Sequence, residues 1–393
     1  MTETAAPTAG TRSIIAILST SNFVIGMGAF VVIGMLEPLS DDLGITPAEA
    51  GWLMTIYALA YAVFSPILVS LTGRIGRRRI LAAALGIFAT ASLLGAMAPD
   101  PITLNATRIL AAAGAGLFTP NTAAVAALLS APEARGKALA AVFMGLTLAQ
   151  VAGVPAGSFI AYTFGWRLAL LLVAVLALPC LWLIWTRVPA GLAFQPSRLS
   201  DLARTLRHGP TMLAVLFTTS FLAAIYVLFT YIAPLLTAQM GYGRNGITLI
   251  LVVFGLGAVV GNLGGGWLAD RIGAVRTLTL LATAQILIMP VFSILPIATP
   301  ALIALAFTWS VAGWSFMAGQ QLRLISLAPA EANVVLALNA AAIYVGAALG
   351  SAAGGAVLAT FGPGALGLAA GAMAILALIH ITVSARLSGT APS

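Results

Sequence analysis

The chain has 393 residues, of which 61% are hydrophobic and only 7% are charged, and its mean hydropathy is +1.08. Because soluble domains carry about 25% charged residues, this composition excludes a soluble globular protein and indicates a chain covered by lipid. The net charge of +8 does not indicate nucleic-acid binding, since the basic residues lie in short loops between apolar runs, where they mark membrane topology.

The apolar runs predict an all-α membrane protein with twelve transmembrane helices. A helix that crosses a bilayer needs about 20 mostly apolar residues. The ninth and tenth spans are separated only by a short turn, which Pro290, Pro296 and Pro300 indicate. We expect the spans at residues 14–36, 48–71, 79–98, 102–128, 137–161, 168–187, 211–237, 246–269, 276–295, 299–322, 333–358 and 364–385.

The charge distribution predicts that both termini are cytoplasmic. With the N-terminus inside, 15 of the 18 lysines and arginines fall in inner segments, as the positive-inside rule requires. The other three are Arg167 and Arg244, which fall in outer segments, and Arg108, which lies within a span.

The two halves of the chain repeat each other. Arg74-Ile75-Gly76 returns as Arg271-Ile272-Gly273, an offset of 197 residues (271 − 74). A repeated polytopic chain predicts a transporter whose substrate binds between the repeats. We expect one six-helix bundle at residues 1–187, a second at 211–393, and between them a cytoplasmic linker at 188–210 with a short basic helix on the membrane surface.

Two short loops at the predicted cytoplasmic face carry this repeat. The loop after the second span holds Arg74, Gly76, Arg77 and Arg78, and the loop after the eighth holds Asp270, Arg271 and Gly273. We expect both loops to act as gates, although the arginines also suit plain topology anchors. We predict that Asp270 pairs with Arg271 or with an arginine of a neighbouring loop, and that this pair stabilises the outward-open conformation.

The second loop, read from Gly266 to Gly273, resembles the signature loop of the major facilitator superfamily, Gly-x-Leu-Ala-Asp-Arg-x-Gly. The first loop departs from that pattern, with Gly73 in place of the aspartate and Val69 in place of the first glycine. The whole chain is similar to the bacterial twelve-span drug:proton antiporters, and most of all to the arabinose/sugar-efflux and purine-efflux permeases.

The resemblance implies a major facilitator fold in a bacterial inner membrane, working as a monomer without a cofactor or a metal. It implies export of a small organic solute (drug, sugar or nucleobase-like) by alternating access in exchange for protons, with membrane lipid as the other partner. An uptake symporter or a facilitator of a neutral solute stays open, because no carboxylate lies near the middle of any span. A non-transporting receptor is a further alternative, whereas no catalytic motif indicates an enzyme.

Small residues recur at every fourth position of the fifth and eleventh spans. Such a stripe lets a neighbouring helix approach closely, and a proline beside it permits a bend. We expect each stripe to pack tightly on one partner helix and to mark the place where the two halves rock. The residues concerned are Gly153, Pro155 and Gly157 in the fifth span, and Gly346, Gly350 and Gly354 in the eleventh.

Arg108 lies inside the fourth span, about 10 Å from its outer end by helix rise. A charge within the membrane is a functional candidate, and the alternative is snorkelling to the outer interface beside Glu37, Asp41 or Asp100. Arg108-Ile109-Leu110 resembles the fourth-span arginine motif of the superfamily, which favours the cavity. For proton coupling we expect Glu37 to titrate and a movement of Arg108 to change its proton affinity.

Polar and aromatic side chains within the spans are the candidates for a substrate cavity. Amides and phenols in an apolar wall suit a neutral or amphipathic ligand, although each alone also suits a hydrogen bond between helices. The set comprises Asn22, Tyr57, Tyr61, Arg108, Asn121, Gln150, Tyr226, Tyr231, Asn262, Gln320, Gln321, Asn339 and Tyr344.

Overall fold

The computed structural model describes residues 9–131, 134–192 and 208–387, and the regular elements within these ranges are all helices. Twelve helical segments, each of at least 20 residues, are long and apolar enough to cross a membrane. The predicted all-α architecture with twelve spans is therefore confirmed. The basic helix predicted in the linker lies outside the described residues.

The N-terminal half contributes six crossings. They are formed by α1 (Ala9–Leu43), α2 (Pro47–Ala50) with α3 (Trp52–Leu71), α4 (Arg77–Ala96), α5 (Pro101–Leu128), α6 (Arg135–Leu148) with the π-helical η2 (Ala149–Gly153) and α7 (Val154–Phe164), and α8 (Trp166–Arg187). Asp100 caps α5 by accepting hydrogen bonds from the amides of Ile102 and Thr103, both at 2.9 Å. The bonds from Thr103 lower the pKa of the Asp100 carboxyl.

The C-terminal half contributes the other six crossings. They are formed by α10 (Gly209–Phe229) with α11 (Ile232–Met240), α12 (Arg244–Ile272), α13 (Ala274–Ile288) with η3 (Met289–Ile294), α14 (Thr299–Trp314) with α15 (Phe316–Leu327), α16 (Ala332–Phe361) after the short η4 (Pro329–Glu331), and η5 (Pro363–Ala365) with α17 (Leu366–Leu387). The tight turn predicted between the ninth and tenth spans falls between η3 and α14.

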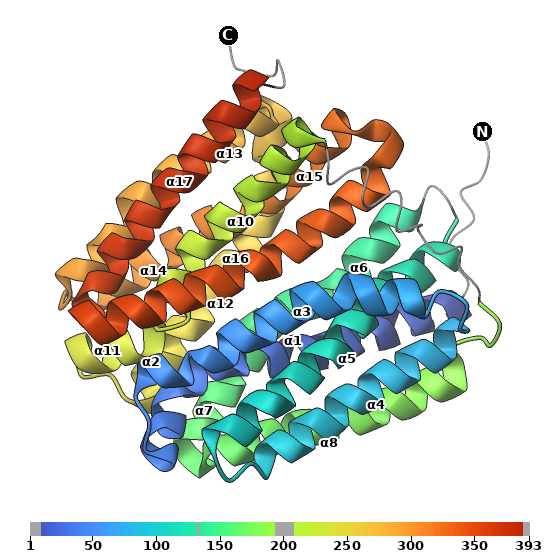
Figure 1. Cartoon of the computed structure of the whole chain (residues 1–393), viewed down its shortest axis with the longest axis horizontal. Coiled ribbons are helices and arrows are strands. Elements are labelled where there is room, and N and C mark those ends of the chain that lie inside the picture. Colours follow the sequence, from blue (N-terminus) through green and yellow to red (C-terminus); the bar gives the residue numbers. More distant parts are fainter. Residues whose placement is uncertain (1–8, 132–133, 193–207, 388–393) are drawn as a thin grey trace.

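The two halves form two groups of helices that meet along α3 and α16 (Figure 1). Helices α1 to α8, coloured blue to green, fill the lower right of the view, and α10 to α17 fill the upper left. We call the end that carries the α3–α4 and α12–α13 loops the cytoplasmic end, following the charge prediction. The opposite end, where α1 and α7 finish, is called the outer end.

The small-residue stripe of the fifth span packs on α1. An ideal Cβ atom on Gly153 would lie 3.0 Å from the Cβ of Met27, and one on Gly157 would lie 2.2 Å from a methyl group of Val31. Pro155 stands at the start of α7, directly after the π-helical turn. The stripe thus brings α7 close against α1, so that a methyl group at Gly157 fits only if the Val31 side chain moves.

The repeated stripe of the eleventh span packs on α10 in the same way, but against backbone. A Cβ atom on Gly346, Gly350 or Gly354 would lie 2.3–2.6 Å from a carbonyl oxygen of α10. Both stripes therefore face a helix of their own half, while the helices that carry them also border the other half, α16 against α3, and η2 and α7 against α12. The seam between the halves includes η2 and α12, because a Cβ atom on Gly255 would lie 2.5 Å from the Cα of Val151.

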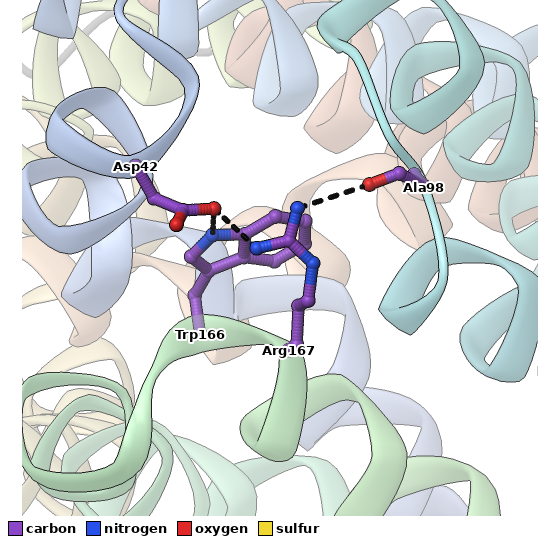
Figure 2. Close-up of polar contacts among 4 residues, drawn as sticks. All are labelled: Asp42, Ala98, Trp166 and Arg167. Carbon is purple, nitrogen blue, oxygen red and sulfur yellow. Dashed lines mark hydrogen bonds and ion pairs between the residues drawn. The ribbon is translucent and has the colours of Figure 1, made fainter.

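An ion pair joins three segments at the outer end of the N-terminal half (Figure 2). The carboxylate of Asp42, near the end of α1, accepts hydrogen bonds from the Arg167 guanidinium and, at 3.0 Å, from the Trp166 indole nitrogen. Arg167 also donates to the carbonyl oxygen of Ala98 at 3.3 Å. These bonds tie the end of α1 and the α4–α5 loop to the start of α8.

Candidate functional site

Four of the tyrosines predicted to line a cavity lie together between the halves. Tyr61 of α3 and Tyr344 of α16 stack with their ring centroids 3.6 Å apart. Tyr57 on α3 and Tyr226 on α10 lie close enough to Tyr344 to interact electrostatically with its hydroxyl group. We call these four residues the tyrosine cluster. Because its members come from both halves, the cluster will change shape whenever the halves move.

Arg108 of α5 extends the tyrosine cluster into the N-terminal half. Its guanidinium carbon lies 4.3 Å from the ring centroid of Tyr57, and its terminal nitrogens donate to the carbonyl oxygens of Gly28 and Ala29 at 2.7 and 2.8 Å. The residue is only 4% exposed. Arg108 therefore lies buried against α1 and α3 and does not snorkel to the outer interface.

The neutralisation of Arg108 by Glu37, Asp41 or Asp100, which the sequence left open, is not found. Glu37 is half-buried, and the charged neighbour that acts on it is Asp41, one turn further along α1. Glu37 comes eight residues after Ala29, whose carbonyl receives Arg108, and this spacing corresponds to about 12 Å along the helix. Arg108 is thus too far away to pair with Glu37 and change its proton affinity in this conformation.

A buried polar knot joins three helices of the N-terminal half. The Asn22 amide nitrogen of α1 donates to the Thr122 hydroxyl of α5 at 3.0 Å and to the Val142 carbonyl of α6 at 3.3 Å. The neighbouring Asn121 accepts a hydrogen bond from the buried Arg77. Both asparagines, predicted to line the cavity, therefore serve contacts between helices here.

The C-terminal half has the equivalent knot at the repeat offset. Gln320 of α15 donates to the Thr218 hydroxyl of α10 at 3.0 Å and to the Ala214 carbonyl at 2.7 Å. Thr218 donates in turn to Asn339 of α16 at 2.6 Å. Thr218, Gln320 and Asn339 correspond to Asn22, Thr122 and Val142, because each lies 197 residues, to within one residue, after its counterpart. Thr122 and Thr218 were missed from the sequence because threonine is common in membrane helices.

Tyr231 lies at the outer contact between the halves. Its hydroxyl donates to the Ser351 carbonyl at 2.8 Å, and a Cβ atom on Gly51 of the other half would lie 2.0 Å from that hydroxyl. Gln150 sits in the π-helical turn, and its side-chain oxygen is buried without a partner among the described residues. Gln321 is exposed on α15.

The first gating loop is anchored on its own half. Arg77 begins α4, is only 2% exposed, and donates its backbone N–H to the Leu192 carbonyl oxygen at 3.1 Å. Arg78 stacks on Trp185 with 5.0 Å between the guanidinium carbon and the ring centroid. Gly76 caps α4, and Arg74 is exposed.

In the second predicted gating loop the acid and the arginine do not pair. Asp270 is exposed and makes no ion pair in the described part of the chain, whereas Arg271 stacks on Trp267 at 4.4 Å. Gly273 connects α12 to α13 with a φ of 83°, in the left-handed region that favours glycine. The pair predicted for the outward-open conformation is therefore absent from the conformation described here.

Three contacts between the halves gather at the centre and the outer end, which is the arrangement expected of an inward-facing conformation. The stacked Tyr61 and Tyr344, the Tyr231 contact with Gly51, and a 3.2 Å hydrogen bond from Arg244 to Thr163 lie near the centre or toward the outer end. A repeated helical membrane chain that closes at one end around a central polar site has the architecture of a secondary transporter.

The comparison with known sequences agrees. Residues 18–339 match the Major Facilitator Superfamily, and the chain belongs to that family of transporters. It is therefore a multi-pass membrane transporter and not an enzyme.

Similar proteins include the inner membrane transport protein YdhP of Escherichia coli O157:H7, which is 33% identical over 94% of this chain and 95% of its own length. A chloramphenicol resistance protein of Streptomyces lividans is 32% identical over 85% of this chain and 86% of its own. The transporter YbcL of Bacillus subtilis, itself uncharacterized, is 30% identical over 86% and 87%.

A solved structure shares the fold. The crystal structure of a bacterial homologue of the human lysosomal transporter Spinster, inward-facing and occupied, aligns with a TM-score of 0.71 over 97% of both chains, at 18% identity. The unoccupied inward-facing form gives a TM-score of 0.70. The major facilitator fold is thereby confirmed.

Proposed function

We propose that this protein exports small organic solutes by alternating access, with residues 1–187 and 211–393 as the two moving bundles and 188–210 as their linker. The observation that carries the proposal is the stack of Tyr61 on Tyr344, which closes the centre of the molecule with one residue from each half. Rocking the halves about this centre exposes the tyrosine cluster first to one side and then to the other.

The chemistry of the centre supports an aromatic or amphipathic substrate. Phenol rings offer flat apolar faces for stacking, and their hydroxyls together with Arg108 offer hydrogen bonds. The similarity to a chloramphenicol resistance protein supports drug-like solutes, and the resemblance to sugar-efflux and purine-efflux permeases adds sugars and nucleobases to the panel to be tested.

Counterflow in proteoliposomes tests the proposal directly. Vesicles loaded with unlabelled chloramphenicol, arabinose or adenine are diluted into the labelled solute, and we expect transient accumulation of at least one. Tyr344→Ala should abolish accumulation while leaving the protein folded. Tyr242→Ala, a tyrosine of the outer α11–α12 loop, is the matched control and should transport normally. Counterflow of the solute by Tyr344→Ala at the normal rate would exclude the tyrosine cluster as the binding site.

For coupling we propose that Glu37 carries the proton, as the half-buried acid at the outer end of α1. Glu37→Gln should abolish substrate-induced acidification reported by an enclosed pH-sensitive dye, while sparing counterflow. A facilitator or an uptake symporter is the second candidate function. It is favoured by the absence of any acidic residue beside the tyrosine cluster in the described chain. Full pH dependence of transport by Glu37→Gln would mean that the proton site lies elsewhere or that the carrier is not proton-coupled.

A further inference from the structure

Arg108 is a buried charge without a countercharge. Two backbone carbonyls and the face of Tyr57 surround it, and no acidic residue of the described chain pairs with it. Carbonyl dipoles and a ring face carry only partial charge, so they do not neutralise a guanidinium. An unpaired charge in the interior of a membrane protein destabilises the fold, so a residue that carries one is a candidate for a functional role.

The same place holds two unused hydrogen-bonding groups. The Nε of Arg108 and the hydroxyl of Tyr57 are both buried and have no partner in the described chain, and Tyr57 is fully buried. Buried polar groups are normally hydrogen-bonded, so a pair of unsatisfied groups beside an uncompensated cation needs an explanation. Both can donate a hydrogen bond, and an anionic oxygen group would accept from both.

We propose that the central site takes an organic anion, in which a carboxylate or a similar acidic group pairs with Arg108 and Tyr57 while a flat apolar body lies against the tyrosine cluster. This inference rests on the proposed transport function and names the class of substrate. The anion would supply the charge that the N-terminal half lacks, and the aromatic rings of Tyr61 and Tyr344 would supply the stacking surface.

The Tyr61–Tyr344 stack decides when the anion reaches Arg108. Tyr57 and Tyr61 stand one turn apart on α3, and Tyr344 covers Tyr61 from the other half. When the halves part at this level, Tyr344 leaves with the C-terminal half and uncovers the face of α3 that leads to Arg108. The anion site is therefore covered as long as this stack is in place, and it opens as the halves part at this level.

Matched solute pairs test the charge requirement. Binding of phenylacetate, indole-3-acetate and 4-nitrobenzoate to the purified full-length protein is compared with binding of the corresponding amides, which keep the shape and lose the charge. We expect at least one carboxylate to bind about tenfold tighter than its amide, as a charge-assisted hydrogen bond provides. Equal or weaker binding of every carboxylate, or no saturable binding of any, overturns the inference.

Two arginine variants assign the preference to its residue. Arg108→Gln should remove the preference for carboxylate while keeping the affinity for the amide, whereas a residue that only braces α5 against α1 would weaken both equally. Arg323→Gln is the control, because Arg323, like Arg108, is buried with nitrogens unpartnered in the described chain, but lies in the C-terminal half, where it bonds to Ser384. If Arg108→Gln fails to fold, Arg108→Lys keeps the charge and should retain a reduced preference. An unchanged preference in Arg108→Gln also overturns the inference.

The outcome separates this inference from the proposed function. Counterflow of neutral solutes with rejection of all anions would leave the export function standing and exclude the anion site. Carboxylate binding that depends on Arg108, without counterflow of any solute, would uphold the site and exclude transport under the conditions used.

Discussion

The two halves of this transporter agree where helices pack and differ where a substrate would bind. Both carry a glycine stripe on the fifth helix of the repeat, and both carry a buried polar knot between the first, fourth and fifth helices. The two halves differ, however, at two positions of the site. The 197-residue offset places Phe254 of the C-terminal half at the position of Tyr57, and Leu305 at the position of Arg108.

The C-terminal half replaces the polar pair by an aromatic cluster. Phe229 stacks on Phe254 with 4.2 Å between ring centroids, and Trp309 packs edge-on against Phe254 at 4.9 Å and Phe292 at 5.1 Å. The comparison indicates a division of labour in which the shared features set the geometry of the repeat. The N-terminal half adds charge and hydrogen-bond donors, and the C-terminal half adds a rigid apolar wall.

The largest expected effect is on the aromatic cluster. Trp309→Ala empties a site that is 1% exposed and whose counterpart in the N-terminal half is Ala112. Loss of a buried tryptophan should lower the free energy of unfolding by about 3–5 kcal/mol, which a melting curve in detergent will register. Trp182→Ala, at a site 63% exposed, is the control and should melt like the wild type. A similar loss in both variants would contradict a special role for the cluster.

A second asymmetry concerns the outer closure, for which the C-terminal half supplies Tyr231 and the N-terminal half the facing Gly51. Gly51→Val places atoms where the Tyr231 hydroxyl lies, so the halves should fail to close at the outer end. In a Cys180→Ser background, Ser351→Cys reports the opening, because position 351 is buried here. We expect the rate at which an impermeant thiol reagent labels this cysteine from outside to rise about tenfold. Overpacking by about 1.4 kcal/mol changes the ratio of open to closed molecules by this factor.

Removal of the obstructing ring provides the rescue for this experiment. Tyr231→Ala combined with Gly51→Val relieves the clash, and labelling should fall back toward the level of the unmodified closure. Labelling that stays high in the double variant would show that position 51 acts through something other than Tyr231.

The glycine stripes allow a finer comparison, since Gly157 and Gly354 are equivalent by the repeat. A Cβ atom on Gly157 meets a movable methyl group of Val31, but one on Gly354 meets the fixed carbonyl oxygen of Val227 at 2.5 Å. Alanine gains about 1 kcal/mol of helix propensity over glycine at either site, against about 1–3 kcal/mol for overpacking. We expect Gly157→Ala to unfold like the wild type and Gly354→Ala to lose about 1–2 kcal/mol, measured by urea unfolding in mixed micelles. Equal losses of unfolding free energy would mean that α1 and α10 accommodate the added methyl group equally well.

The number of spans and the repeat were predictable from sequence because lipid enforces long apolar runs and because the copies share local motifs. The position of the stripes was also predictable, but not which helix they face, since small residues fit any partner. The partners of Arg108 could not be predicted. They are the backbone carbonyls of Gly28 and Ala29, and carbonyls look the same at every residue of a sequence.

Residue type alone does not separate cavity residues from residues that join helices. The amides of Asn22, Gln320 and Asn339 are polar groups within spans, yet each bonds to a threonine of its own half. The tyrosines are polar groups within spans too, and four of them lie together, because aromatic rings are large enough to reach across the space between the halves.

The smallest effect is expected at the outer end of the N-terminal half, where Asp42 pairs with Arg167. The C-terminal half has Gln239 and Gly364 at the equivalent positions and makes no ion pair there within the described residues. Both charged side chains are close to half exposed, at 46% and 42%, so the pair should contribute less than about 1 kcal/mol. Asp42→Asn keeps an acceptor for the Trp166 indole and removes only the charge. We expect a slight loss of unfolding free energy at low salt that disappears in 1 M salt, where the Debye length is about 3 Å. A loss that persists at high salt would mean that the geometry of the three joined segments, and not the charge, distinguishes this end of the N-terminal half from its repeat.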